Sequence, residues 1–266
     1  MIRLAANLSM MFGEHAFLER FRAARDCGFR GVEYLFPYEA PASTIAAALQ
    51  DNGLTQVLFN FPGGNWSAGE RGIAALPERT SEFRDGVGKA LDYARATGCP
   101  RLHAMTGRAV SPASSTKQLE TFVENLRFAA DAVAIDGIDV MIEPINSRVD
   151  IPGYLLDTTA KAEWVLSAVD RPNVKIQYDI YHMQIMEGDL ARTLERLLPR
   201  IGHVQLADNP GRNEPGTGEI NYPWLLARLD ALGYQGWVGC EYKPAGATRD
   251  GLAWAKPYLT AQENVR

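Results

Sequence analysis

Four polar residues that each follow a short apolar run are the side chains best placed to do chemistry in this sequence. Glu143 follows DVMI, Asp179 follows VKIQY, Gln205 follows IGHV and Glu241 follows GWVGC. A charge at the end of a buried run is costly unless something pairs with it. Carboxylate and amide oxygens are the donors that hard divalent cations prefer, whereas zinc usually recruits His or Cys. We therefore expect these four side chains to bind a divalent metal ion, Mg²⁺ or Mn²⁺.

Taken singly, some members of this set have ordinary structural explanations. Asp179 alone is better explained as a helix cap or as part of a loop salt bridge, and Gln205 alone as a hydrogen-bonded core amide. Glu143 and Glu241 are harder to explain in this way, because each follows a run that should be buried. The metal prediction depends on the four side chains meeting at one place.

The pattern of the chain indicates how they could meet. Eight apolar runs alternate with segments of helical period, and the runs cover residues 3–10, 31–36, 54–61, 101–107, 139–146, 174–182, 201–208 and 236–244. Strands separated by helices run parallel, and their near-continuous apolar character indicates that both faces are covered. Eight repeats predict an α/β fold, a closed (β/α)8 TIM barrel, formed as a single domain by residues 1–266. An open doubly wound sheet is the competing architecture, but the glycine-dense loop 209–221 lacks its phosphate-binding fingerprint.

Three helices are marked by their ends as well as by their period. The clearest is predicted over 115–136, with Ser115 and Gln118 as a capping box and Gly137 where it stops. A second has Asp189 as its N-cap, and a third follows Pro223.

Composition narrows the class of protein. The net charge of −5 and the lack of a basic stripe disfavour nucleic-acid binding, and no apolar run approaches membrane-spanning length. Three widely spaced cysteines argue against a disulfide framework. We expect a cytoplasmic protein that acts on a small molecule and that could form a homo-oligomer.

In a barrel of this kind the carboxyl ends of all strands face the active site, so the four polar residues share one rim. His182, Arg212 and Lys243 lie near the same strand ends. Each is a candidate for binding an anionic substrate, although His182 could equally pair with a carboxylate, and the two cations could be solvated surface charges. His203 is expected to pack deeper in the barrel, and core packing is the better explanation for His103 and Trp66.

A cation held by carboxylates can polarise a carbonyl and an adjacent hydroxyl together, which lowers the barrier to removing the proton between them. Two glutamates, Glu143 and Glu241, could then take a proton from one carbon and return one to its neighbour through an enediolate. The chemistry predicted from these residues is aldose–ketose isomerisation or epimerisation.

The chain resembles the hydroxypyruvate isomerase family of the xylose isomerase-like barrels over nearly its whole length. The motifs that carry the resemblance are AANLSMMFGE (5–14), FRGVEYLFPY (29–38), AGERGIA (68–74), EFRDGV (82–87), IEPIN (142–146), QYDIYHMQ (177–184), ADNPGRNEPGTGEINY (207–222) and GWVGCEYKP (236–244). The resemblance implies interconversion of hydroxypyruvate and tartronate semialdehyde, with Glu143 and Glu241 as the catalytic pair. It also implies a metal at the same four residues. The segment INSRVDIPGY departs from the family form by one extra residue, which leaves the role of Asp150 open.

Several alternatives remain at this point. A close branch of the family isomerises 2-oxo-tetronate, and related barrels epimerise ketose sugars at carbon 3 with the same glutamate pair. A metal-dependent endonuclease on a similar barrel would need further His and Asp ligands and a basic surface, whereas this chain has four histidines and an acidic balance. A barrel that binds a sugar acid without turning it over is the last alternative.

Overall fold

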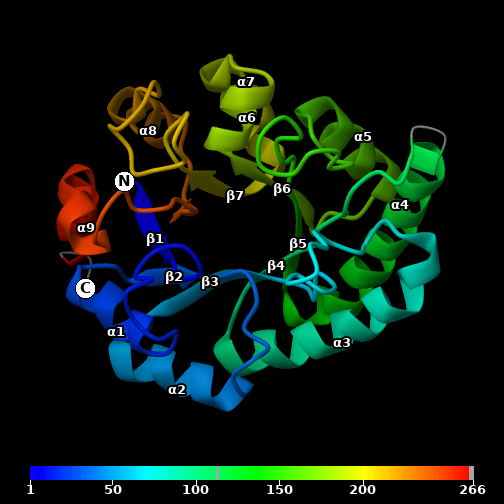
Figure 1. Ribbon diagram of the computed structural model, residues 1–266, viewed down its shortest axis with the longest axis horizontal. Helices are drawn as coiled ribbons and strands as arrows, with labels where there is room; N and C mark the ends of the chain where they lie inside the picture. The colour runs from blue at the N-terminus through cyan, green and yellow to red at the C-terminus, as the bar shows by residue number, and fades with distance from the viewer. Residues whose placement is uncertain (112–113, 264–266) are drawn as a thin grey trace.

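The strands close into a barrel in chain order. The computed structural model describes residues 1–111 and 114–263. Within them all neighbouring strands are parallel, and pairing of the first strand with the last closes the barrel (Figure 1). The strands are β1 (Arg3–Asn7), β2 (Gly31–Glu33), β3 (Thr55–Asn60), β4 (Arg101–His103), β5 (Asp139–Ile142), β6 (Val174–Asp179), β7 (Ile201–Leu206) and β8 (Trp237–Cys240). The predicted (β/α)8 barrel is confirmed.

Helices surround the barrel on its outside (Figure 1). They are α1 (Glu19–Asp26), α2 (Ala42–Asn52), α3 (Thr80–Thr97), α4 (Ser115–Val133), α5 (Thr159–Val169), α6 (Ile180–Met186), α7 (Leu190–Leu197), α8 (Tyr222–Ala231) and α9 (Lys256–Glu263). Short 3-10 helices cover Pro77–Arg79, Ala134–Asp136, Leu198–Arg200 and Thr248–Ala255. In the part of the chain that the structure describes, none of the helices has the length and apolar character needed to cross a membrane.

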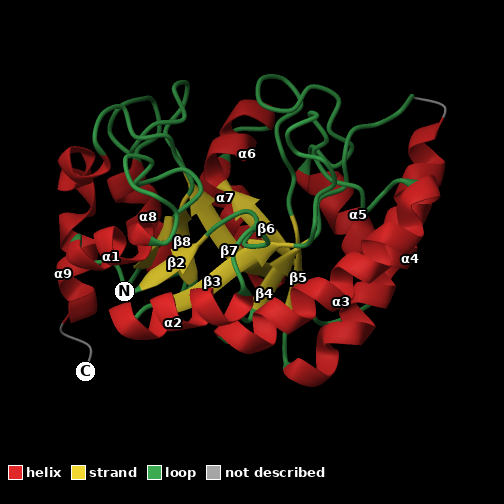
Figure 2. Cartoon of the chain, turned by 60° about the horizontal axis from the view of Figure 1, so that its bottom comes forward, coloured by secondary structure: helices red, strands yellow, loops and turns green. Residues whose placement is uncertain are grey.

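The apolar runs of the sequence predicted the first residue of each strand more accurately than its last residue. Every strand starts within one residue of its predicted position, and every strand stops one to four residues earlier than its run. Glu143 and Glu241 therefore stand immediately after the last residues of β5 and β8, while Asp179 ends β6. After β5 and β8 the chain leaves the ladder and enters the loops that gather on one side of the barrel (Figure 2), whereas β6 leads directly into α6. The carboxyl ends of the strands therefore carry the polar residues.

Helix boundaries agree with the sequence, but the predicted capping box is wrong, and the predicted N-cap Asp189 lacks the expected hydrogen bond to its helix. The segment 115–136 forms α4 followed by a 3-10 turn, and Gly137 ends it in the left-handed conformation with φ 67°. No capping box forms at the start of α4, because the side-chain oxygen of Gln118 accepts a hydrogen bond from the Val110 amide instead. Asp189 occupies the N-cap position of α7, but its carboxylate accepts from Arg192 and not from the helix backbone.

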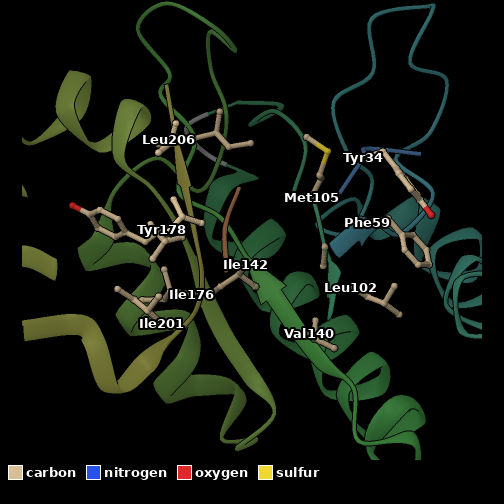
Figure 3. Close-up of a cluster of buried hydrophobic side chains, with 14 of the residues drawn as sticks. Tyr34, Phe59, Leu102, Met105, Val140, Ile142, Ile176, Tyr178, Ile201 and Leu206 are labelled. Carbon is tan, nitrogen blue, oxygen red and sulfur yellow. The ribbon is translucent and has the colours of Figure 1, made fainter. Parts of the chain in front are cut away.

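The two faces of the strands have different chemistry. Successive strand residues point to opposite faces. Val140 and Ile142 of β5 and Ile176 and Tyr178 of β6 belong to the buried apolar cluster between strands and helices (Figure 3). The alternate positions face the barrel interior, where the register places Asp179 opposite Gln205. The same alternation that builds the core on the outside thus directs a ring of polar groups to the inside.

Candidate active site

A cavity of about 440 Å³ opens among the loops at the carboxyl ends of the strands, a size typical of small-molecule sites. All but one of the predicted site residues line this cavity: Glu143, His182, Gln205, Arg212, Glu241 and Lys243. The exception, Asp179, is fully buried, with Oδ2 3.8 Å from Nε2 of the cavity-lining His182. The structure thus brings together residues that are far apart in the sequence.

Asp179 combines the two roles that the sequence left as alternatives. Its Oδ1 caps helix α6 by accepting the backbone amides of Tyr181 at 2.8 Å and His182 at 3.3 Å. Its Oδ2 is buried and makes no hydrogen bond with the described residues. One oxygen therefore holds the side chain in place, and the other is free to bind something else.

Glu143 presents a second unpaired oxygen at the same place. Its side chain is almost completely buried, and Oε1 has no hydrogen-bond partner in the described part of the chain. Oε1 lies 3.7 Å from Nε2 of His182, while Oε2 lies 3.7 Å from Nδ1 of His103. A buried carboxylate with an unpaired oxygen is costly, so this geometry indicates a binding function.

Glu241, in contrast, has partners for both oxygens. Its Oε1 accepts from Nη2 of Arg212 at 2.8 Å, and its Oε2 accepts from the side-chain amide of Gln205 at 2.5 Å. The carbonyl oxygen of Gln205 accepts from the side-chain amide of Gln177 at 2.6 Å. Gln205 therefore directs its nitrogen, and not its oxygen, toward the carboxylate.

Asp150 and Lys243 flank Arg212. Asp150 accepts from Nη1 of Arg212 at 2.8 Å and from the hydroxyl of Tyr181 at 2.9 Å. Asp150 thus holds Nη1 of the Arg212 guanidinium, and Glu241 holds Nη2. The exposed Lys243 lies at the edge of the cavity, where its backbone amide donates to the carbonyl of Arg212.

The position of the proton on His182 follows from its neighbours. The carbonyl of Asn146 accepts the backbone amides of Val149 and Asp150, so its NH₂ group faces Nδ1 of His182 at 2.7 Å. Burial and the nearby Arg212 hold the pKa of His182 well below its usual value. The ring is therefore neutral. Its Nδ1 accepts at 2.7 Å, a much shorter contact than the 3.5 Å between Nε2 and Nη2 of Arg212, so we assign the ring hydrogen to Nε2. That hydrogen faces the carboxylates of Glu143 and Asp179.

Burial and mutual repulsion alter the acidity of these carboxyl groups. Burial, with the charges of Glu241 and Asp179, raises the pKa of Glu143 well above its ordinary value. Burial raises the pKa of Glu241 to about 8 despite Arg212, and that of Asp179 to about 6. Burial opposes the charge of Arg212, but the surrounding carboxylates raise its pKa. One guanidinium is thus shared among several acidic groups.

These residues fit a divalent cation. Ligand atoms of Glu143, Asp179 and His182 all lie within 4.8 Å of one another. Among them, the unpaired Glu143 Oε1 and Asp179 Oδ2 are hard oxygen donors that a cation would stabilise. This cluster shares Glu143 and Asp179 with the predicted metal set. His182 lies beside them but directs its Nε2 hydrogen toward the two carboxylates, while Gln205 and Glu241 direct their oxygens to protein partners.

The chain can now be compared with known proteins. Residues 21–258 match the model of the xylose isomerase-like TIM barrel family. The chain belongs to this family. It is 52% identical to 2-oxo-tetronate isomerase of Cupriavidus necator, covering 97% of this chain and 99% of the relative. It is 50% identical to hydroxypyruvate isomerase of Escherichia coli, covering 97% and 100% of the two chains. The expectation of an isomerase is therefore confirmed.

A solved structure of a family member supports the same conclusion for the fold. It is described as AP endonuclease, family 2, from Brucella melitensis, and it is 52% identical to this chain. The two structures agree with a TM-score of 0.95 over 97% of this chain and 99% of the other. The xylose isomerase-like barrel is thus matched by both sequence and structure.

Glu33 is a buried member of this xylose isomerase-like site that the sequence analysis did not single out. Its carboxyl group is fully buried and accepts from Asn7 at 3.1 Å, Gln205 at 2.7 Å and His203 at 2.7 Å. Gly239 makes room for it, because a Cβ at that position would lie 2.4 Å from both carboxyl oxygens. The available signal was a carboxylate within the apolar run GVEYLF, the same signal that identified Glu241.

The structure also corrects two smaller expectations and adds a contact to a third residue. His103 and Trp66 line the cavity, so the preference for core packing was wrong for both. Burial lowers the pKa of His103 to about 3, and its ring hydrogen-bonds to Asn60 with Nδ1 and Oδ1 3.2 Å apart. His203 is fully buried, as expected for a residue deeper in the barrel, but its Nε2 hydrogen-bonds to Glu33.

Replacing Glu33 with alanine is expected to lower the free energy of unfolding by about 3–5 kcal/mol, because the buried groups of Asn7, His203 and Gln205 lose their shared partner. Urea denaturation measures this loss. Glu39→Ala on the exposed surface is the matched control and should change stability by less than about 0.5 kcal/mol. A loss below about 1 kcal/mol for Glu33→Ala would contradict the structural role argued from these contacts.

The free energy of unfolding measured in excess chelator is expected to fall as the pH rises from about 5 to about 8. Burial raises the folded-state pKa of Glu241 to about 8 from 4.5, so the folded protein keeps a proton that the unfolded chain has released. Stability present at the lower pH is therefore lost as the pH rises through this window. Carboxyl groups with a lowered pKa, such as Glu70, affect stability only below this window. The raised pKa of Glu143 adds to the fall, whereas the lowered pKa values of His103 and His182 oppose it below about 6.5, so the fall should be steepest between about 6.5 and about 8. Glu241→Gln should make the free energy of unfolding depend less on pH. A free energy of unfolding that rises between these pH values would refute the raised pKa of Glu241.

Proposed function

We propose that the protein interconverts hydroxypyruvate and tartronate semialdehyde by proton transfer. The observation that carries the proposal is the placement of two buried glutamates, Glu143 after β5 and Glu241 after β8, on the walls of one cavity. These strands are not neighbours in the barrel, so the two carboxyl groups approach the cavity from different sides. The relative from Escherichia coli carries the name of this activity.

The reaction moves one proton between adjacent carbons. One glutamate removes a proton from carbon 3 of hydroxypyruvate, which gives an enediolate across carbons 2 and 3. The other glutamate delivers a proton to carbon 2, and the hydroxyl proton of carbon 3 passes to the oxygen of carbon 2, leaving an aldehyde. Burial raises the pKa of both glutamates, but only Glu241 is hydrogen-bonded to a cation, so Arg212 makes Glu241 easier to ionise than Glu143 and suits it to act as the base. The raised pKa of Glu143 suits it to donate.

The remaining side chains orient the substrate and its charges. His182 can donate its Nε2 hydrogen to a substrate oxygen, and Arg212 and Lys243 supply positive charge at the cavity wall. A divalent cation, Mg²⁺ or Mn²⁺, would polarise the substrate carbonyl and its neighbouring hydroxyl when bound. Glu143 and Asp179 would hold it with their unpaired oxygens. Gln205 and Glu241 complete the proposed ligand set, and ligation by Gln205 requires its oxygen to leave Gln177.

A second candidate substrate is 2-oxo-tetronate, one carbon longer. The relative from Cupriavidus necator bears that name and is as similar to this chain as the hydroxypyruvate isomerase. The deciding experiment measures kcat/KM for the two substrates side by side. A higher value for hydroxypyruvate supports the first candidate, a higher value for 2-oxo-tetronate supports the second, and turnover of neither refutes both.

The proposed chemistry has its own test and its own rivals. In heavy water the product carbon should acquire deuterium, whereas complete retention of the substrate hydrogen would indicate a hydride shift instead. Turnover of a ketose sugar at carbon 3 would indicate the epimerase alternative. Incision of DNA at abasic sites would support the activity in the name of the Brucella melitensis relative.

A further inference from the structure

The loop that joins β3 to α3 forms one wall of the cavity and is held firmly in place. Amides of Ala74 and Ala75 in this loop donate to the carbonyls of Met105 and Thr106, each at 3.1 Å. Gly72 passes so close to the β4 side that a Cβ there would lie 2.5 Å from the carbonyl oxygen of Met105, and its φ of +114° is one that only glycine adopts readily. The backbone next to Gly72 is therefore fixed relative to the barrel.

Arg71 projects from this fixed backbone into the cavity. It is half-buried, it lines the cavity, and its guanidinium lies over the ring of Trp66 at 4.1 Å. Its Nη1 donates to the backbone carbonyls of Trp66 at 3.1 Å and Glu70 at 2.7 Å. These contacts define the orientation of the guanidinium plane while using only one of its three nitrogens.

The charge of Arg71 is not compensated by the protein. Throughout residues 1–111 and 114–263, no carboxylate lies within ion-pair distance of it, and its Nε and Nη2 groups make no hydrogen bond. The neighbouring Glu70 directs its own carboxylate away, to Arg79 at 2.7 Å. A planar guanidinium with two unused nitrogens, facing a polar cavity, matches the geometry of a carboxylate.

The other two cations of the cavity are less suited to this task. Arg212 already donates to the carboxylates of Asp150 and Glu241, so its charge is largely balanced. Lys243 is exposed to solvent at the cavity edge, where an ammonium group gains little from a charge pair. Of the cavity-lining cations in the described chain, Arg71 alone combines partial burial, a fixed orientation and an unbalanced charge.

We propose that Arg71 binds the carboxylate of the substrate and that Trp66 positions it by stacking. The proposal rests on the proposed function, in that it assigns the recognition of an oxo acid to a residue outside the acid–base pair. Holding the carboxylate at the loop wall leaves the other carbons of a short oxo acid to reach Glu143 and Glu241. Arg71 then determines that the site prefers oxo acids over uncharged sugars of the same length.

The test replaces Arg71 and compares a charged substrate with an uncharged one. Dihydroxyacetone differs from hydroxypyruvate only in carrying CH₂OH where the acid has its carboxylate. Arg71→Gln should lower kcat/KM for hydroxypyruvate about 10–100-fold, mainly through KM, and leave any slow turnover of dihydroxyacetone unchanged. Arg71→Lys should restore part of the loss. Equal losses for both compounds would show that Arg71 is structural and would overturn the proposal.

Two further variants isolate the role of the side chain. Arg108 is exposed, is not among the cavity-lining residues, and donates to the carbonyl of Gly69 in the same loop at 2.6 Å. Arg108→Gln therefore tests loop anchoring without removing a cavity charge, and it should behave like the unaltered protein. Lys243→Gln tests the rival cation. A loss of oxo-acid preference in Lys243→Gln that is absent in Arg71→Gln would assign carboxylate binding to Lys243 instead.

A binding measurement separates this proposal from the proposed function. Glycerate has the carboxylate but no carbonyl to isomerise, so calorimetry can follow its binding without turnover. The unaltered protein and Arg108→Gln should bind it, and Arg71→Gln should bind it about 10–100-fold more weakly. This pattern would support Arg71 even if neither oxo acid were isomerised, in which case only the proposed function fails. Equal glycerate affinity in Arg71→Gln and the unaltered protein would overturn the role of Arg71 whatever the turnover.

Discussion

Replacing Glu143 or Glu241 with glutamine is expected to lower kcat for the isomerised oxo acid by about 10²- to 10⁴-fold, because each substitution removes an acid–base group while keeping the size of the side chain. KM should change much less, since neither carboxyl group is proposed to bind the substrate carboxylate. The two residues act on one proton transfer, so the double variant should be barely slower than the slower single variant. Steady-state kinetics on the three variants measures these effects.

The controls for this pair follow from the structure. Glu219→Gln removes an exposed carboxyl group that pairs with Gln184 and Asn209 and should leave kcat unchanged. Oε1 of Glu143 accepts no hydrogen bond from the residues that the structure describes, so Glu143→Gln should fold normally, which a thermal melt verifies. If both glutamine variants keep more than about a tenth of the original kcat, the acid–base assignment is wrong.

Stripping divalent cations with a chelator is expected to remove nearly all turnover, and Mg²⁺ or Mn²⁺ should restore it. The physical reason is the group of buried carboxylates around Glu143 and Asp179, whose two unpaired oxygens a cation would stabilise. Binding should also stabilise the fold, by about 2.7 kcal/mol when the free ion is at 100 times its dissociation constant. Thermal melts of the stripped protein with and without added ion provide this second readout.

Asp179→Asn tests whether the carboxylate of Asp179 binds the divalent cation. Asparagine caps helices as well as aspartate does, so the hydrogen bonds from the amides of Tyr181 and His182 to the start of α6 can persist. The free Oδ2 carboxylate oxygen is lost. The variant should therefore fold but lose the stabilisation by Mg²⁺ or Mn²⁺. Full activity in chelator-treated protein, with no shift in the melt on adding either ion, would exclude a required cation.

The structure also shows which parts of the site were accessible from sequence. Glu143, Asp179 and Glu241 could be found because a carboxylate at the end of a buried run contradicts the pattern around it. Glu33 carries the same signal but lies inside its run, and only the register that aligns β1 with β2 and places Gly239 beside it reveals its partners. A pattern along one strand cannot report which groups of other strands it meets.

The roles of the charged loop residues depended even more on tertiary structure. Arg71 belongs to the motif AGERGIA, where nothing distinguishes it from a surface arginine. The proposed role of Arg71 rests on the position of the loop, the contact with Trp66 and the absence of a carboxylate partner within the residues described. Asp150 similarly acquires its role through Arg212, 62 positions further along the chain. Such pairings are made by the fold, because they join loops that follow different strands.

The sequence by itself determined the barrel, the number and order of its strands, and the ring of oxygen-bearing residues at their carboxyl ends, because apolar periodicity and strand polarity are local properties of the chain. Only the tertiary structure decided which oxygens of that ring are free and which are hydrogen-bonded. It placed His182 beside Glu143 and Asp179, turned the oxygen of Gln205 toward Gln177, and left Arg71 unbalanced. The physical reason is that hydrogen-bond and charge partners are set by distances between atoms, which the order of residues along a chain does not contain.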